Sequence, residues 1–114
     1  MRKAQKNNQD FPTLIKRFEE DIIYDAHSLI ARFERSAAQK ELFQRGRKSL
    51  RPIIEHIKNQ EHFSKFQVIG NSLDIAWGKL LNRFEILLDP DRTAPKDLRD
   101  ITGWIAWAER FATN

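Results

Sequence analysis

Residues 63–88 carry the pattern that decides the fold, and they read FSKFQVIGNSLDIAWGKLLNRFEILL. Ser64 stands three residues before Gln67, which is the spacing of a helix capping box, and Phe63 and Val68 occupy the hydrophobic-staple positions around it. The apolar side chains then recur in steps of three and four, at Phe66, Ile69, Leu73, Trp77, Leu80, Phe84 and Leu87. This period is typical of an amphipathic helix, so we expect one helix from Phe63 to about Leu88.

The first part of the chain shows the same period from Phe11 onward. Its apolar positions are Phe11, Leu14, Ile15, Phe18, Ile22, Ala26, Leu29, Phe33 and Ala37. Pro12 falls in the first turn of this helix, where its missing N–H costs nothing. The pattern can continue as far as Phe43, but Ser36 and Gln39 have capping-box spacing, so we expect a break between them.

Two further helices are expected in the middle and at the end of the chain. Gly46 is a predicted helix stop, and Ser49 is the predicted N-cap of the next helix, with Pro52 still in its first turn. The stripe of that middle helix is Leu50, Ile53, Ile54 and Ile57, followed by a predicted loop at residues 59–62. A second predicted loop at residues 88–95 precedes a last helix, which should begin near Pro95 or Asp97. The stripe of the last helix is Leu98, Ile101, Ile105, Ala108 and Phe111.

No stretch alternates between apolar and polar side chains with a period of two, so no strand is expected. The sequence therefore predicts an all-α protein of four or five helices packed as antiparallel hairpins, without a β-sheet. Gly70 and Gly78 lie within the predicted long helix but do not break its apolar stripe. They would permit close approach by another helix.

Composition bounds the class of protein. The 114 residues suffice for one domain, and 40% of them are hydrophobic, which argues against general disorder. We expect a basic disordered tail over residues 1–10 and a single helical domain over residues 11–114. The absence of cysteine excludes disulfides and thiolate metal sites, and no run of 18 residues is free of charge. We therefore expect a soluble, cytoplasmic protein.

Positive charge is concentrated in the first half of the chain. The net charge of the whole chain is +4, and all of the excess lies before or at Arg51. The densest run is residues 45–51, where Arg45, Arg47, Lys48 and Arg51 precede and open a predicted helix. Unpaired N–H groups at a helix start favour anions, so one interpretation is a phosphate or nucleic-acid contact. The other interpretation is a solvated, charged turn between helices.

Trp104 and Trp107 lie three residues apart on the last helix and so occupy adjacent rows of its surface. In one interpretation both indoles close the end of the core. In the other, at least one is exposed and contacts a partner protein or a second copy of the chain, because tryptophan often anchors interfaces.

The sequence contains no recognisable catalytic or metal-binding constellation. Its four isolated glycines cannot form a phosphate-binding glycine motif. No two of His27, His56 and His62 have the spacing of metal ligands on one helix, although His56 and His62 could meet across a loop. We therefore expect no cofactor, no metal and no enzymatic activity.

Residues 46–57, which read GRKSLRPIIEHI, resemble the first helix of a HEAT-like repeat. Such a repeat has a small residue, a leucine and an early proline before an apolar helix, which packs on a longer second helix. Here residues 63–88 would be that second helix, and residues 46–88 have the length of one repeat. The resemblance implies a helical scaffold that presents a surface to a partner protein.

Two functional hypotheses follow from these patterns. The first is a non-enzymatic interaction module that binds a partner protein through a helix face. The second is a small protein that binds nucleic acid or phosphate through residues 45–51, with help from Arg2, Lys3 and Lys6.

Overall fold

The computed structural model describes residues 9–24, 27–59 and 70–112, which form six α-helices, one 3₁₀ turn and no strand. The elements are α2 (Phe11–Tyr24), α3 (Leu29–Arg35), α4 (Ala37–Gln44), η1 (Gly46–Ser49), α5 (Leu50–Lys58), α6 (Gly70–Leu88) and α7 (Ile101–Phe111). The predicted all-α class is confirmed. None of the described helices is both long and apolar enough to cross a membrane.

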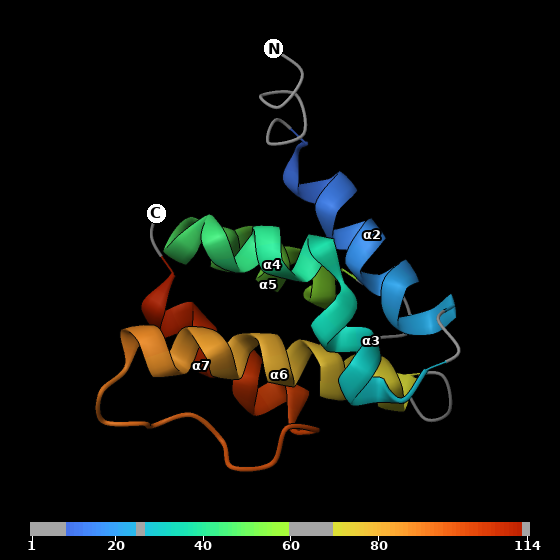
Figure 1. Cartoon of the computed structure of the whole chain (residues 1–114). Helices are drawn as coiled ribbons and strands as arrows, with labels where there is room; N and C mark the ends of the chain where they lie inside the picture. The colour runs from blue at the N-terminus through green and yellow to red at the C-terminus, as the bar shows by residue number, and fades with distance from the viewer. Residues whose placement is uncertain (1–8, 25–26, 60–69, 113–114) are drawn as a thin grey trace.

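Helix α2 packs against several other helices. It contacts α4, α5 and α6, while α7 packs against α5 and α6 (Figure 1). A single cluster of buried hydrophobic side chains joins all these helices. Its largest fully buried members are Trp77, Trp104, Trp107, Phe18 and Phe84. The Phe18 and Trp77 rings, from α2 and α6, lie 4.6 Å apart between centroids.

The segment before Gly46 forms three helices, where the sequence pattern predicted one helix with a break. The predicted break is confirmed, because the side chain of Ser36 accepts a hydrogen bond from the Gln39 amide at 3.1 Å and caps α4. An additional break separates α2 from α3, and Ser28 caps α3 by accepting from the Ala31 amide at 3.3 Å. Apolar periodicity missed this break because the stripe keeps its spacing across it.

In the connection between α4 and α5, the predicted helix stop is confirmed, whereas the predicted N-cap of the next helix is not. Gly46 follows the end of α4 with a φ of +76°, the left-handed conformation that favours glycine. The prediction that Ser49 caps α5 is wrong, because its hydroxyl donates instead to the carbonyl of Leu42 at 2.7 Å. The turn η1 runs directly into α5, so Ser49 already has helical dihedral angles and cannot act as an extended N-cap. The predicted stripe of Leu50, Ile53, Ile54 and Ile57 is fully buried.

Helix α6 presents most of its predicted stripe to the core. Leu73, Trp77, Leu80 and Phe84 are all buried. Leu87 is 58% exposed, so its predicted place in the stripe is wrong, and Leu88 packs against the core instead. Around the helix axis, Leu88 lies about 40° from Phe84, four residues earlier, whereas Leu87 lies about 60° from Phe84 in the opposite direction. Leu88 is therefore closer than Leu87 to the buried face of α6. The predicted capping box at residues 63–68 and most of the predicted loop at residues 59–62 lie outside the described residues.

The last helix begins later than predicted, at Ile101 rather than near Pro95 or Asp97. Asp100 caps it by accepting a hydrogen bond from the Gly103 amide at 3.0 Å. Residues 89–100 form an irregular connection of turns and bends, which passes against α6 at Leu98. A Cβ atom built on Gly78 would lie 2.1 Å from the carbonyl oxygen of Leu98, so the glycine permits close approach by this connection, not by a helix.

Candidate functional site

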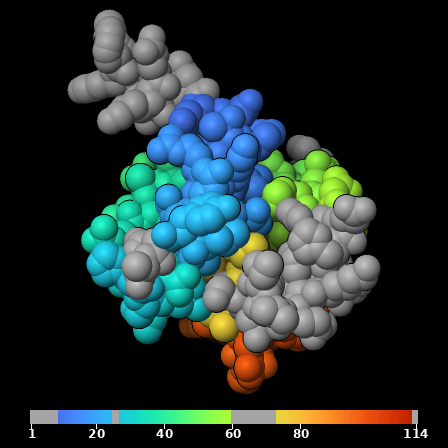
Figure 2. Space-filling view, turned by 90° about the vertical axis from the view of Figure 1, so that its right-hand side faces the viewer, coloured from blue at the N-terminus to red at the C-terminus, as the bar shows by residue number. Residues whose placement is uncertain are grey.

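A groove with a largely apolar lining lies between α2 and α5. It encloses about 430 Å³. Its lining residues are Phe11, Pro12, Ile15, Arg51, Pro52, Glu55, His56 and Asn59. In Figure 2, α2 in blue and α5 in light green lie side by side on the face turned toward the viewer. The groove thus joins residues that stand about 40 positions apart in the sequence.

The α2 wall of the groove is held in place by polar contacts at the start of that helix. The carboxylate of Asp10 accepts a hydrogen bond from the Thr13 amide at 2.9 Å and so caps the first turn. The guanidinium of Arg45 lies over the Phe11 ring, 5.1 Å from its centroid, and forms an ion pair with Glu41 at 2.9 Å. Phe11 is therefore fixed at the edge of the groove by a cation from α4's C-terminal cap.

The α5 wall combines an apolar side chain with charge. The apolar side chain of this wall is Pro52, in the first turn of α5. The floor of the groove is Ile15, a buried residue of α2. Arg51 lies at the start of α5 and is half-buried, while Glu55 lies one turn further on and is exposed. The groove therefore has a cationic end and an anionic end.

The structure separates the four basic residues that the sequence grouped. Arg45 is engaged by Glu41 and Phe11, whereas Arg51 lines the groove. Arg47 and Lys48 are exposed in η1, directly before Arg51. Within the described part of the chain, no ion pair or hydrogen bond engages the side chains of Arg47, Lys48 or Arg51. Three cations without a partner in the described part of the chain thus lie in η1 and at the start of α5, and Arg51 is the one of them that lines the groove.

His56 is anchored by a carboxylate that joins three helices. Glu19 of α2 uses its Oε2 atom to contact His56 Nε2 of α5 at 3.0 Å and to accept from the Trp77 indole of α6 at 2.9 Å. These contacts fix the wall of the groove behind His56. Sequence analysis raised His56 as a metal ligand with His62, which lies outside the described residues. Among the residues that the structure describes, no cluster of three or more potential ligands could hold a metal ion.

A second hollow, of about 390 Å³, lies between α2, α3 and α4. Most of its polar lining is already used within the chain. The Ser36 hydroxyl donates to Asp21 at 2.6 Å, and the Arg32 guanidinium donates to the Ile22 carbonyl. This hollow has exposed apolar neighbours, with Tyr24 79% and Ile30 66% exposed.

Trp104 and Trp107 are buried, with 0% and 1% of their surface exposed. Of the two interpretations, the structure therefore supports the one in which both indoles close the core, and not the one in which at least one is exposed. Trp104 donates to the carbonyl of Asp97 at 3.1 Å, and Trp107 donates to Oδ2 of Asp89 at 2.9 Å. Each indole thus satisfies its N–H while it packs, which ties the connection of residues 89–100 to α7.

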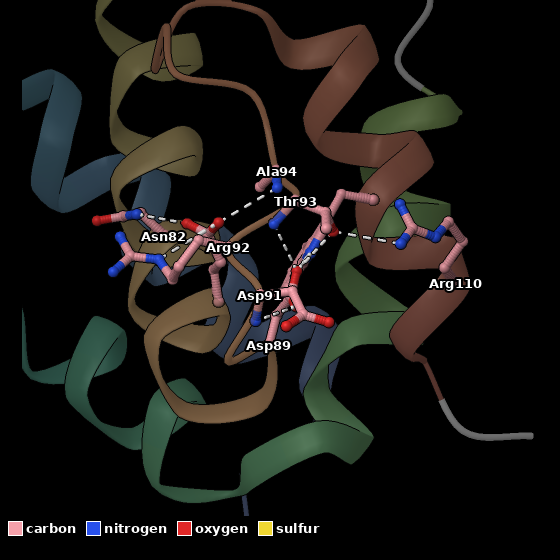
Figure 3. A network of polar contacts seen from close by, with 9 residues as sticks. Asn82, Asp89, Asp91, Arg92, Thr93, Ala94 and Arg110 are labelled. Atoms are coloured by element: carbon pink, nitrogen blue, oxygen red, sulfur yellow. Dashed lines mark hydrogen bonds and ion pairs between the residues drawn. The ribbon is translucent and has the colours of Figure 1, made fainter.

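The carboxylate of Asp89 organises the connection between α6 and α7 (Figure 3), and the carboxylate of Glu85 also accepts a hydrogen bond from this connection. Asp89 accepts from the Thr93 hydroxyl at 2.6 Å and from the amides of Thr93 and Asp91. Glu85 accepts from Asn82 and from the Ala94 amide. The hydrogen bond from Thr93, followed by that from Trp107, lowers the pKa of Asp89 to about 2. Because each of these four carboxylate oxygens accepts at least one hydrogen bond from within the chain, the network is structural.

Sequence reasoning found the cations of the candidate site and missed its apolar half. Phe11 and Ile15 were placed in the core stripe of one helix, and Pro52 was noted only as a residue tolerated in a first turn. Nothing in the local pattern indicates that α2 and α5 are neighbours. The one available signal was that Phe11, Pro12 and Pro52 occupy first turns, where apolar side chains have little helix of their own to pack against.

Comparisons with known protein families, with curated proteins and with solved structures find no significant match to this chain.

Proposed function

We propose that this chain is a non-enzymatic helical interaction module that binds a partner protein through the groove between α2 and α5. The observation that carries the proposal is the juxtaposition of Phe11, Pro12 and Pro52 with Arg51, whose charge has no partner in the described part of the chain. Apolar grooves with a few placed polar groups are the usual form of a peptide or ligand site. The resemblance to HEAT-like repeats stays a prediction, and it points in the same direction.

Site-specific photo-crosslinking tests this proposal. A photoreactive phenylalanine analogue replaces Asn59, an exposed residue that lines the groove, in the full chain. The matched control carries the analogue at Ala106, an exposed residue of α7. We expect discrete protein adducts from position 59 that an excess of unlabelled chain competes away, and none from position 106. Equal adducts at both positions, or none at position 59, would contradict the proposal.

The second candidate function is binding of nucleic acid or phosphate by residues 45–51. It is favoured by the exposure of Arg47 and Lys48 without an ion pair in the described residues, next to the start of α5. The engagement of Arg45 by Glu41 reduces the cations that such a ligand could use. A salt series with a single-stranded oligonucleotide separates the two functions. Phosphate binding weakens steeply with salt, and changing Arg45, Arg47, Lys48 and Arg51 together to Gln should flatten that slope.

A further inference from the structure

We infer that the occupant of the groove between α2 and α5 is an acidic peptide segment, in which an aspartate or glutamate binds Arg51 and a neighbouring apolar side chain enters between Phe11, Pro12 and Pro52. This inference rests on the proposed function, because it specifies the partner of the same groove. Three features of the described residues carry it: a rigid apolar wall, an uncompensated cation at one end, and a carboxylate one turn away.

The apolar wall is already formed in the unbound chain. Pro12 and Pro52 have fixed φ angles in the first turns of the two helices, and the Arg45 guanidinium lies over the Phe11 ring. Ile15, which is 2% exposed, closes the floor. A ligand side chain that enters this space loses conformational entropy, but the protein side chains around it lose little, because they are already ordered. Such preorganisation reduces the cost of binding.

The charge at one end of the groove selects the sign of the ligand. Arg51 is half-buried and lines the groove, and Arg47 and Lys48 lie just before it. A guanidinium can bind a carboxylate through two parallel hydrogen bonds, and partial burial strengthens such a pair relative to one in open solvent. Arg51 and Glu55 are the one arginine and the one acidic residue that line the groove among the described residues, and the exposed Arg47 and Lys48 add positive charge just before Arg51 in the sequence. The local charge therefore favours an acidic segment.

Glu55 also sets the direction in which that segment lies. It stands four residues after Arg51 on α5, and side chains at this spacing lie about 5–6 Å apart at their Cβ atoms. No ion pair joins Arg51 to Glu55 in the structure. A second acid on the ligand near Glu55 would be repelled, whereas a basic or amide side chain would be attracted there. The favoured ligand thus carries an acid at the Arg51 end and a cation or hydrogen-bond donor at the Glu55 end.

A random peptide library displayed on phage, selected on the full-length chain, tests this pattern. We expect wild-type chain to enrich sequences with Asp or Glu beside an apolar residue. Arg51→Glu should turn the selection toward Lys or Arg at that position, and the best wild-type peptide should lose affinity for it by about tenfold to a hundredfold. Glu55→Lys is a second variant, and it should enrich acidic residues at both ends. Both changes suit the dipole of α5, and circular dichroism verifies that the variants remain folded.

Arg17→Glu is the matched control. Arg17 is exposed on α2 and lies about 200° around the helix from Ile15, so it points away from the groove. This variant should select the same acidic peptides as wild type.

Failure of the inference and failure of the proposed function give different results. If selected peptides are neutral or basic, or if Arg51→Glu leaves the selection unchanged, the inference is overturned. The proposed function still stands in that case provided that Phe11→Ala abolishes selection. If wild type enriches no sequence beyond the Phe11→Ala variant, both are overturned.

Discussion

Trp107 donates its indole N–H to Oδ2 of Asp89 at 2.9 Å, which fastens α7 to the end of α6. The same oxygen accepts from the amide and the hydroxyl of Thr93, at 2.8 and 2.6 Å. One buried carboxylate thereby fixes both the last helix and the connection that leads to it. This arrangement holds the connection between Leu88 and Asp100, which has no periodic pattern, against α7.

Asp89→Asn should lower the thermal midpoint and change the acid limb of the stability curve. The folded pKa of Asp89 is about 2, held down first by the Thr93 hydroxyl, whereas an aspartate in the unfolded chain titrates near 3.9. The stabilisation is therefore complete above about pH 4 and is lost as the pH falls from about 4 to 2. Urea unfolding of wild type and variant between pH 2 and 7 measures this difference.

Asp91→Asn is the control for that experiment, because the Asp91 side chain is exposed and only its backbone amide contacts Asp89. If Asp89→Asn and Asp91→Asn give the same pH profile, Asp89 does not hold the connection.

Gly78→Ala should destabilise the fold by about 3 kcal/mol or more, because the added methyl group would overlap a backbone carbonyl that cannot rotate away. That methyl group would lie 2.1 Å from the oxygen and 2.9 Å from the carbonyl carbon of Leu98. Chemical denaturation measures the loss. No cost, or a gain of up to about 1 kcal/mol as expected for Gly→Ala inside a helix with open space around it, would show that residues 89–100 do not cross α6 here.

Gly46 provides a contrasting case, because nothing lies within 4 Å of a Cβ atom built there. Its φ of +76° is the only obstacle. Gly46→Ala should cost about 1–2 kcal/mol from backbone strain, and Gly46→Asn should cost less, since asparagine adopts this conformation more readily.

Asp74→Asn should raise the free energy of unfolding at neutral pH. Burial raises the pKa of Asp74 to about 6, and its Oδ1 atom is buried without a hydrogen-bond partner among the described residues. The folded pKa exceeds the unfolded value near 3.9, so ionisation is disfavoured in the folded state. Wild-type stability should therefore fall as the pH rises from about 4 to 6 and stay lower above that, by about 1–2 kcal/mol after allowance for residual solvent screening.

The variant lacks this dependence. The difference between Asp74→Asn and wild type should accordingly be small at pH 4 and reach its full size by about pH 7. A difference that does not change with pH would mean that Asp74 titrates normally in the folded chain.

Glu19→Gln should weaken the junction of α2, α5 and α6. The Glu19 carboxylate serves both His56 and Trp77 through one oxygen, at 3.0 and 2.9 Å. An amide is a weaker acceptor and presents only one oxygen, so a loss of about 1–2 kcal/mol is expected. Glu20→Gln is the neighbouring control, since Glu20 is exposed and makes no hydrogen bond in the described residues. Equal effects of the two substitutions would argue against the junction.

Local signals in the sequence predicted local structure well and its assembly poorly. The stripe Ile53, Ile54, Ile57 and the cap at Ser36 depend on residues within one or two turns, and both were predicted. Ser49 does not cap α5, because its hydroxyl donates a hydrogen bond to the Leu42 carbonyl across a turn. No rule based on sequence spacing predicts this contact. The candidate groove needed knowledge that α2 packs against α5, and only the folded chain supplies it.

The two buried tryptophans also depend on contacts that local sequence patterns do not predict. Trp104 and Trp107 sit beside an apolar stripe, so periodicity alone left core and interface open as interpretations. Their burial is decided by acceptors from the connection at residues 89–100, the Asp97 carbonyl and the Asp89 carboxylate, which let the indole N–H groups leave water without loss.

Chemical-shift mapping tests the central claim most directly. Isotope-labelled full-length chain is titrated with the acidic peptide that it selects best, and amide shifts are followed for every assignable residue. The account predicts that the largest shifts fall on Phe11, Ile15, Arg51, Glu55 and His56, that they saturate together, and that Arg51→Glu removes them. Shifts that cluster instead on α7 or on the surface of Tyr24 and Ile30, or a peptide that perturbs no amide, would contradict the groove between α2 and α5 as the binding site.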